Sequence, residues 1–325
     1  MGAEEMSALS FSVDLERALE VGGRLGAVVL EGAVERAVID PDGRYPLASV
    51  RKVVTLGGYA LAVSSGACDP ARPVPISEID RWHWPGTDGG AHERARSWWA
   101  ETGNVQPGRE PSVSLRSVAL AMIRFSDSAA ADYLLYRIGE EYVPRFIQRI
   151  GMTAQDLIRP ALGEFRAWHR SPEQWLTMSP AERTRTARKF AMTDESPLDA
   201  MPVDEATQRR CAAVGCQGTA REWGRLMATL ATGTGLPLDA RGIMREALER
   251  PAAPGDDGRF GAKAGDLPGI LSFAGYVRAR GAGAPDAAVA MFLSGLDRDR
   301  LHRMSAALPQ TPTQLLELAE VLAAR

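Results

Sequence analysis

The sequence predicts an α/β fold in which one sheet is assembled from both ends of the chain, with a helical lobe inserted between them. Two β-branched runs near the N-terminus, at 24–34 and 36–40, are interrupted by a glycine and followed by a Pro-Asp-Gly turn, which is typical of a hairpin. Three strand-like runs follow one another near the C-terminus, at 260–263, 271–278 and 287–294. Between these two groups the apolar residues recur mostly at helical spacing.

The expected helices share apolar residues at helical spacing and end at a turn or a glycine. They cover about 12–21, a stretch that begins at Ser49, then 113–124, 128–138, 140–150, 171–190, 219–232 and 238–250, and finally 312–324. Residues 66–110, rich in Gly, Pro and Trp, predict a long structured connection. We expect a sheet lobe made of 1–64 and 252–325 and a helical lobe made of 65–251. A cleft between two such lobes is a favoured position for a site.

Composition narrows the classes of function. The chain has 325 residues, 45% of them hydrophobic, and a net charge of −3, so it lacks the basic excess that binding to nucleic acid or to an anionic membrane requires. The first twenty residues carry acids where a signal peptide has a basic and then an apolar segment. No signal peptide is visible, and we expect a cytoplasmic protein, although a leader removed beforehand is not excluded.

Neither the cysteines nor the histidines form a metal-binding or redox motif. Three cysteines occur without a Cys-x-x-Cys pair, and four histidines occur without a His-x-x-x-His pair. We therefore expect no disulfide framework, no metal and no other cofactor.

Lysine is scarce in this sequence. Of 38 basic side chains only three are lysines, at Lys52, Lys189 and Lys263. Arginine cannot lose its proton in a protein, whereas a buried lysine can become a neutral amine and act as a base. Lys189 follows Arg188 in a charged stretch and is expected on the surface. Lys52 and Lys263 are the candidates for chemistry.

Ser49 and Lys52 form a Ser-x-x-Lys pair where a helix is expected to begin. Residues three apart lie on one helix face, so the lysine amine can reach the serine hydroxyl and activate it as a nucleophile. The unpaired N–H groups at a helix start can also stabilise developing negative charge. Taken alone, a capping serine near a surface lysine is the better explanation of the pair.

The order of three motifs along the chain is more specific. Ser49-x-x-Lys52 is followed by Ser126-Asp-Ser128 and then by Lys263-Ala-Gly265. This order resembles the Ser-x-x-Lys, Ser-Asp-Asn and Lys-Thr-Gly motifs of the penicillin-recognising serine enzymes, and class A β-lactamases most closely. The resemblance covers most of the chain. It implies a β-lactamase-like fold, with a mostly antiparallel sheet, flanking helices and an inserted all-helical lobe.

The resemblance also implies a role for each matching residue. Ser49 corresponds to the acylated nucleophile and Lys52 to its proton acceptor. Ser126 corresponds to the hydroxyl that relays a proton to the leaving group, and Lys263 to the cation that holds Ser126. The backbone N–H groups of Ser49 and Asp266 correspond to the oxyanion hole.

The substrate-binding positions Ser128, Ala264 and Gly265 depart in part from the family. Gly265 leaves room for a substrate along the strand edge. Ser128 is shorter than the asparagine it replaces, and Ala264 lacks the hydroxyl of the threonine it replaces. Asp266 would repel a carboxylate, and the strand at 272–276 has no arginine to bind one. We expect weakened binding of penicillin-like acids.

The motif that class A β-lactamases use for deacylation, Glu-x-x-Leu-Asn, does not occur in this chain. Ala161 stands at the corresponding position, and Glu164 is the one candidate for a displaced glutamate, with a surface acid as the simpler interpretation. Without an activated water the acyl-enzyme should persist, or be resolved by Lys52 or by another nucleophile.

The resulting hypothesis is a serine acyl hydrolase or acyltransferase that acts on a small ester, thioester or amide through an acyl-Ser49 intermediate. Three alternatives stay open: a true β-lactamase, a D,D-peptidase of the penicillin-binding type, and a non-catalytic protein that uses the fold as a ligand pocket. The expected partner is a small-molecule acyl substrate, with no nucleic acid and no membrane. The sequence does not predict an oligomeric state.

Overall fold

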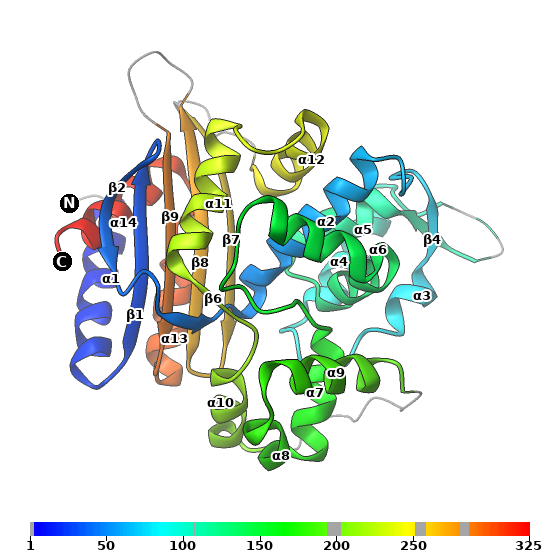
Figure 1. The fold of residues 1–325 in the computed structure, drawn as a ribbon, viewed down its shortest axis with the longest axis horizontal. Coiled ribbons are helices and arrows are strands. Elements are labelled where there is room, and N and C mark those ends of the chain that lie inside the picture. Colours follow the sequence, from blue (N-terminus) through cyan, green and yellow to red (C-terminus); the bar gives the residue numbers. More distant parts are fainter. Residues whose placement is uncertain (1–2, 107, 109, 194–202, 251–257, 280–285) are drawn as a thin grey trace.

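A five-stranded antiparallel sheet forms the centre of the fold (Figure 1). The computed structural model describes residues 3–106, 108, 110–193, 203–250, 258–279 and 286–325. The strands are β1 (Arg24–Glu31), β2 (Val34–Ile39), β7 (Gly258–Leu267), β8 (Ile270–Ala279) and β9 (Ala287–Ser294), in the spatial order β2-β1-β9-β8-β7. Because β1 pairs with β9, the sheet joins the two ends of the chain. The predicted hairpin and fold class are confirmed.

Helices cover both faces of this sheet (Figure 1). On one face lie α1 (Ala3–Glu20), α13 (Arg298–Ala306) and α14 (Pro312–Ala323), and on the other lies α11 (Ala220–Thr232). Apolar residues of the first layer, among them Leu15 and Leu318, share one buried cluster with Leu271 and Met291 of the sheet. An ion pair between Asp14 and Arg303 links α1 to α13. The first layer of helices buries one face of the sheet, and β7 is one of its two edge strands.

The second lobe is helical (Figure 1). Its central helices are α2 (Lys52–Ser64), α5 (Leu115–Arg124) and α6 (Ser128–Arg149), with α12 (Leu238–Leu248) packed against α2 and α5. Alongside them lie β4 (Pro73–Pro75), α3 (Ile76–Asp80) and α4 (Ala91–Glu101), which belong to the predicted connection over 66–110, and β5 (Ser112–Ser114), which follows it. The remaining elements are β3 (Arg44–Pro46), η1 (Ala48–Arg51), α7 (Ala161–Arg170), α8 (Pro172–Thr177), α9 (Pro180–Ala191), α10 (Glu205–Ala213) and β6 (Gln217–Thr219).

The prediction of two helices at 128–138 and 140–150 is wrong, because α6 runs without a break across Gly139 and Pro144. One face of α6 packs against α2, where two glycines of α2 allow the two helices to approach each other closely. A Cβ at Gly57 would lie 2.3 Å from the ring of Phe146, and one at Gly58 would lie 2.8 Å from Val143. This tertiary packing outweighs the local preference of glycine and proline to end a helix.

The expected lobes, 1–64 with 252–325 and 65–251, stay a prediction, and two helices pack outside the lobe to which these boundaries assign them. Helix α11 lies inside 65–251 but packs on β1, β8 and β9. Helix α2 lies inside 1–64 but packs among the helices of the other lobe. Each helix is placed by the surface that its apolar residues contact, which its position in the chain does not reveal.

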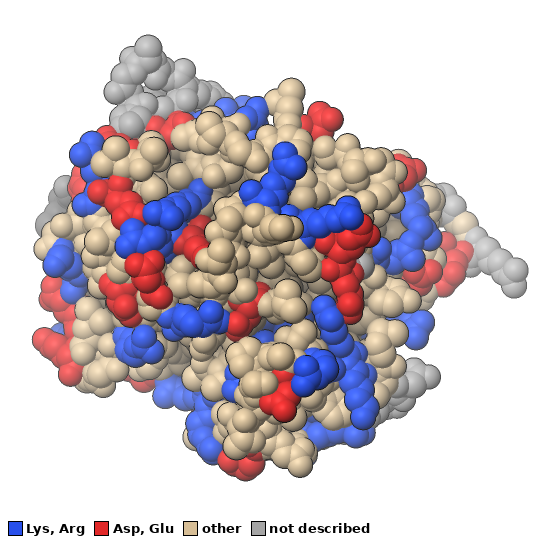
Figure 2. Space-filling model, in the orientation of Figure 1, with Lys and Arg blue, Asp and Glu red and all other residues tan. Residues whose placement is uncertain are grey.

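The surface is electrostatically mixed. Figure 2 shows acidic and basic side chains interspersed over one face of the molecule. Surface arginines commonly pair with acids, as Arg221 does with Glu35 and Asp42. In the part of the chain that the structure describes, none of the helices combines the length and the apolar character that a membrane-spanning helix needs.

The close contact between α2 and α6 leads to a stability prediction. Gly57→Ala places a methyl group against the ring of Phe146, so the free energy of unfolding should fall by about 1–3 kcal/mol. Gly242→Ala is the matched control, because it lies inside α12 with no atom within 4 Å of its added Cβ. This control should stabilise by about 0.5–1 kcal/mol. Urea unfolding of both variants measures the difference, and equal effects would contradict the proposed packing.

Candidate active site

Ser49 lies in the 3₁₀ turn η1, immediately before α2. The chain leading into it is held on both sides. The Leu47 N–H donates to the Cys216 carbonyl at 2.9 Å, and the hydroxyl of the buried Ser272 donates to the Leu47 carbonyl at 2.6 Å. Ala48 has a φ of +43°, in the left-handed region that side-chain-bearing residues rarely adopt. These contacts fix the backbone in the turn that presents the serine hydroxyl to the site.

Gly265 brings the edge strand β7 against this turn. A Cβ at Gly265 would lie 2.3 Å from the Ser49 nitrogen and 2.9 Å from the Val50 nitrogen. A side chain at position 265 would therefore collide with the backbone of the candidate nucleophile itself, in addition to any substrate on the strand edge. The same Gly265 carbonyl accepts a hydrogen bond from Ser272 at 3.0 Å, so β7, β8 and the turn are tied together.

Lys52 lies 4% exposed on the first turn of α2 and points at a group of serines. Its Nζ lies 3.1 Å from the Ser49 Oγ, 3.1 Å from the Ser128 Oγ and 3.3 Å from the Ser126 Oγ. It also donates to the Ser126 carbonyl. Burial, opposed by the charge of Asp127 and aided by that of Arg51, lowers the pKa of Lys52 to about 8. Such an amine is neutral often enough near neutral pH to accept the Ser49 proton.

Ser126 lies between the two lysines. Its φ of +63° is in the left-handed region, and it occupies the tight turn between α5 and α6. Lys263, on β7, donates to the Ser126 Oγ at 2.9 Å. Burial, together with the charge of Lys52, holds the pKa of Lys263 well below its usual range. One hydroxyl is thus contacted by an amine from each lobe, which is the arrangement a proton relay requires.

The substrate-binding positions suggested by the resemblance lie around these groups. Ser128 lies at the start of α6, and its Oγ is within hydrogen-bond distance of the Lys52 amine. Ala264 packs partly against the cluster on the far face of the sheet and accepts a hydrogen bond from Lys263 through its carbonyl. Asp266 is exposed, next to Gly265 on the strand edge. The structure gives these positions no side chain positioned to bind a carboxylate.

Glu164, on α7, is only 4% exposed and lines a pocket together with Ser49 and Lys52. It is bound by two guanidinium groups. Arg51 pairs with one of its oxygens, and the Arg159 Nε donates to the other at 2.6 Å. Although burial opposes ionisation, the charges of Arg51 and Arg159 lower the pKa of Glu164 below its ordinary value. The interpretation of Glu164 as a surface acid is wrong. A carboxylate held in this way is a weak base.

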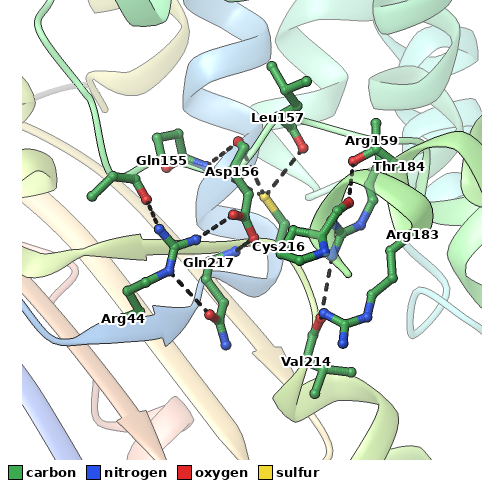
Figure 3. A network of polar contacts seen from close by, with 12 residues as sticks. Arg44, Gln155, Asp156, Leu157, Arg159, Arg183, Thr184, Val214, Cys216 and Gln217 are labelled. Atoms are coloured by element: carbon green, nitrogen blue, oxygen red, sulfur yellow. Dashed lines mark hydrogen bonds and ion pairs between the residues drawn. The ribbon is translucent and has the colours of Figure 1, made fainter. Parts of the chain in front are cut away.

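The segment that leads to Glu164 is tied to strands β3 and β6 (Figure 3). Arg44 pairs with Asp156 and donates to the Ala154 carbonyl, and the Gln217 N–H donates to Asp156 at 3.0 Å. Asp132 of α6 then accepts the N–H groups of Ala161 and Leu162, at 2.9 and 2.8 Å, at the start of α7. Burial raises the pKa of Asp132 to about 6. Residues 154–162, which lead to Glu164, are therefore held by hydrogen bonds at both ends.

Three charged side chains, Asp127, His92 and Asp80, form a hydrogen-bonded series that begins next to Ser126. Asp127 is fully buried, and its Oδ1 caps α6 by accepting the N–H groups of Ala129 and Ala130. Its Oδ2 lies 3.0 Å from Nδ1 of His92, whose Nε2 lies 2.9 Å from Asp80. Burial opposes the charged imidazolium, but hydrogen bonds to the two carboxylates raise the pKa of His92 to about 9. His92 is therefore a cation at neutral pH and holds Asp127 beside the Ser126 turn.

One group of potential metal ligands lies nearby among the described residues. His83, Asp88 and Glu93 offer ligand atoms within 4.8 Å of one another. Both oxygens of Asp88 already accept N–H groups of the first turn of α4, at 3.1 Å, so helix capping explains this carboxylate.

The described residues enclose a pocket of about 660 Å³ at this place, within the usual range for small-molecule sites. The sequence-predicted site residues all line it: Ser49, Lys52, Ser126, Ser128, Glu164, Lys263, Ala264, Gly265 and Asp266.

Comparison with known proteins gives the family. A sequence profile of the β-lactamase enzyme family matches residues 16–310. The chain belongs to this family. No curated protein matches the chain.

Solved β-lactamase-family structures share the fold. A β-lactamase from Sphaerobacter thermophilus is 17% identical, with a TM-score of 0.62 and 96% of each chain covered. A mutant of the penicillin-binding protein PBP-A, an acyl-enzyme complex with penicillin-G, is 14% identical, with a TM-score of 0.59 over 98% of this chain and 96% of the other. A mutant class A β-lactamase of the last common ancestor of Gram-negative bacteria is 19% identical, with a TM-score of 0.56 over 94% of this chain and 97% of the other.

Four residues of this β-lactamase-family site were not found from the sequence. Arg51, His92, Asp132 and Ser272 act through contacts between elements far apart in the chain. One signal for Arg51 is present in the sequence, since it stands inside the Ser-x-x-Lys motif, between Ser49 and Lys52. The partners of the other three are separated from them in the sequence and become neighbours only when the elements that carry them pack together.

The buried imidazolium predicts a pH-dependent stability. Because the pKa of His92 is about 9 in the fold and near 6.5 when unfolded, its charge stabilises fully below about pH 6.5, and this contribution is lost as pH rises through 9. His92→Gln should lower the free energy of unfolding by about 3 kcal/mol at about pH 6, and by much less at about pH 10. Urea unfolding over this range measures the gap.

His302→Gln is the matched control, since His302 is exposed on α13. It should leave the unfolding curve unchanged at every pH. A gap between wild type and His92→Gln that stays constant across the pH range would contradict a charged His92.

Proposed function

We propose that this protein is a serine acyl hydrolase or acyltransferase, acting on a small ester, thioester or amide through an acyl-Ser49 intermediate. One observation carries the proposal: the amine of Lys52, with its pKa lowered to about 8, lies 3.1 Å from the Ser49 hydroxyl. A hydroxyl beside a buried amine is the pairing that an activated serine nucleophile needs.

Acylation follows from the positions of the four side chains. The Ser49 oxygen attacks the acyl carbonyl carbon and its proton passes to the neutral Lys52. The backbone N–H groups of Ser49 and Asp266 stabilise the oxyanion. The bond from the carbonyl carbon to the leaving group then breaks, and the leaving group takes a proton through the Ser126 hydroxyl, which both lysines contact. The products are an ester on Ser49 and a free alcohol, thiol or amine.

Deacylation is where we propose that this chain differs from a rapid β-lactamase. Because Arg51 and Arg159 both bind the Glu164 carboxylate, it is poorly suited to take a proton from water. The acyl-enzyme is then long-lived and passes its acyl group slowly to water, or to a second nucleophile that enters the pocket. Efficient β-lactam hydrolysis is the second candidate, favoured by the family and by the position of Glu164 in the pocket.

Mass spectrometry of the intact protein tests the nucleophile. After incubation with an activated ester, a penicillin and a cephalosporin in separate samples, wild type should carry one stable adduct with the mass of the acyl group, and Ser49→Ala should carry none. Ser65→Ala, a serine that ends α2 outside the pocket, is the matched control and should be acylated like wild type. Fast cephalosporin turnover without an adduct would favour a true β-lactamase. An adduct on Ser49→Ala would exclude the assignment of the nucleophile.

The pKa of Lys52 predicts how acylation depends on pH. Because the neutral amine is the base, the acylation rate should rise with pH and level off above about 8. Lys52→Arg keeps the charge but cannot be deprotonated, so it should lower the rate by at least about 100-fold. Lys189→Arg, an exposed lysine on α9, should behave as wild type. Stopped-flow acylation by a chromogenic ester gives the profile, and an unchanged rate in Lys52→Arg would exclude Lys52 as the base.

A further inference from the structure

The pocket is lined by more basic than acidic side chains. Seven basic side chains line it: Arg51, Lys52, Arg94, Arg124, Arg250, Lys263 and Arg298. Four acidic ones line it: Asp88, Glu164, Glu205 and Asp266. Arg51 is engaged with Glu164, and Arg298 lies 3.4 Å from Glu205. The guanidinium groups of Arg94, Arg124 and Arg250 have no carboxylate partner in the described part of the chain.

These three arginines are exposed and come from three different parts of the chain that line the pocket. The exposed part of the pocket where they lie is called its mouth below. Arg94 lies on α4 and donates to the Gly89 carbonyl at 2.8 Å. Arg124 ends α5, and Trp98 and Phe125 pack against its guanidinium. Arg250 follows α12, near Phe260, and donates to Gln310. Each side chain is partly held in place and still has in-plane N–H groups to offer a ligand.

The charge of Arg250 acts inside the pocket. After burial, the charges of Lys52 and Arg250 lower the pKa of Lys263 against the opposing charge of Asp266. The Asp88 carboxylate accepts the N–H groups at the start of α4, and its charge offsets part of this positive charge, because it acts to raise the pKa of Lys52. A pocket lined in this way attracts anions and favours those with several oxygens, which guanidinium groups bind in pairs.

Asp266 limits where the anion lies. It is exposed beside Gly265, next to the Ser49 backbone, where a carboxylate close to the acyl carbon would be repelled. The negative charge of the ligand therefore belongs at the mouth, away from the reacting carbonyl. Several unpaired guanidinium groups at the mouth suit a phosphate or diphosphate better than a single carboxylate.

We propose that Arg94, Arg124 and Arg250 form a subsite for phosphate groups on the leaving-group side of the acyl donor. The inference rests on the proposed function, because it names the class of substrate for the same pocket: a thioester or ester whose departing thiol or alcohol carries phosphate. In the reaction the bond from the acyl carbon to that sulfur or oxygen breaks, the Ser49 ester forms, and the phosphate-bearing leaving group departs with one proton.

Two acyl thioesters with the same acyl group test the subsite, one with pantetheine and one with a phosphate-bearing pantetheine as the leaving thiol. At low salt, acylation of Ser49 by the phosphate-bearing donor should be at least about tenfold faster, and the difference should shrink as salt is added. Arg94→Gln, Arg124→Gln and Arg250→Gln together should remove the preference, measured within this variant as the ratio of its rates with the two donors. Arg149→Gln, an exposed arginine at the end of α6 outside the pocket, is the matched control and should retain it.

Calorimetric titration with inorganic pyrophosphate separates the subsite from the chemistry. Wild type, Ser49→Ala and Arg149→Gln should bind pyrophosphate, and the triple arginine variant should bind it at least about tenfold more weakly. Loss of pyrophosphate binding in the triple variant would support the subsite even if neither thioester acylates Ser49, a result that would overturn the proposed function alone. Equal acylation by the two thioesters, pyrophosphate binding unchanged in the triple variant, or succinate binding as tightly as pyrophosphate would each overturn the phosphate subsite.

Discussion

Burial of the Lys52 amine is the constraint on which the site depends. A lysine removed from water must satisfy its N–H groups, at most three, within the protein, and here three serine hydroxyl oxygens and the Ser126 carbonyl lie within hydrogen-bond distance of the amine. These contacts hold Ser126 in its left-handed conformation and bring the turn between α5 and α6 to the start of α2. Lys263 then contacts Ser126 from β7, so that hydroxyl joins the helical lobe to the sheet. The burial that lowers the pKa of Lys52 follows from the packing of the two lobes around it.

The ion group formed by Arg51, Glu164 and Arg159 determines the chemistry available after acylation. A buried carboxylate between two guanidinium groups stays ionised but has little tendency to bind a further proton. Removing one partner of such a group leaves a buried charge uncompensated, so the arrangement resists change. Because Arg51 shares the turn η1 with Ser49 and directly precedes Lys52, the residue that binds Glu164 belongs to the same short segment as the nucleophile. This shared segment connects the proposed slow deacylation to the geometry of acylation.

Much of the fold was predictable, because strands and amphipathic helices carry their period in the sequence. The terminal strands and the helices α5, α11, α12 and α14 follow that period closely. The errors have physical causes. Helix α6 continues through a glycine and a proline because it packs on the glycine face of α2, and α13 was missed because its one buried residue, Met304, leaves no apolar stripe to detect. Local preference decides an element only where tertiary contacts do not oppose it.

The sequence by itself determined which side chains are available for chemistry at this site. Three short motifs, together with the scarcity of lysine, identify Ser49, Lys52, Ser126 and Lys263, because their spacing within each motif is local. Only the tertiary structure decided what surrounds them. The pairing of Glu164 with two arginines, the cation at His92 behind Asp127 and the arginines at the mouth depend on distances between residues far apart in the chain. Coulomb forces and burial follow those distances, and the order of residues along the chain does not encode them directly.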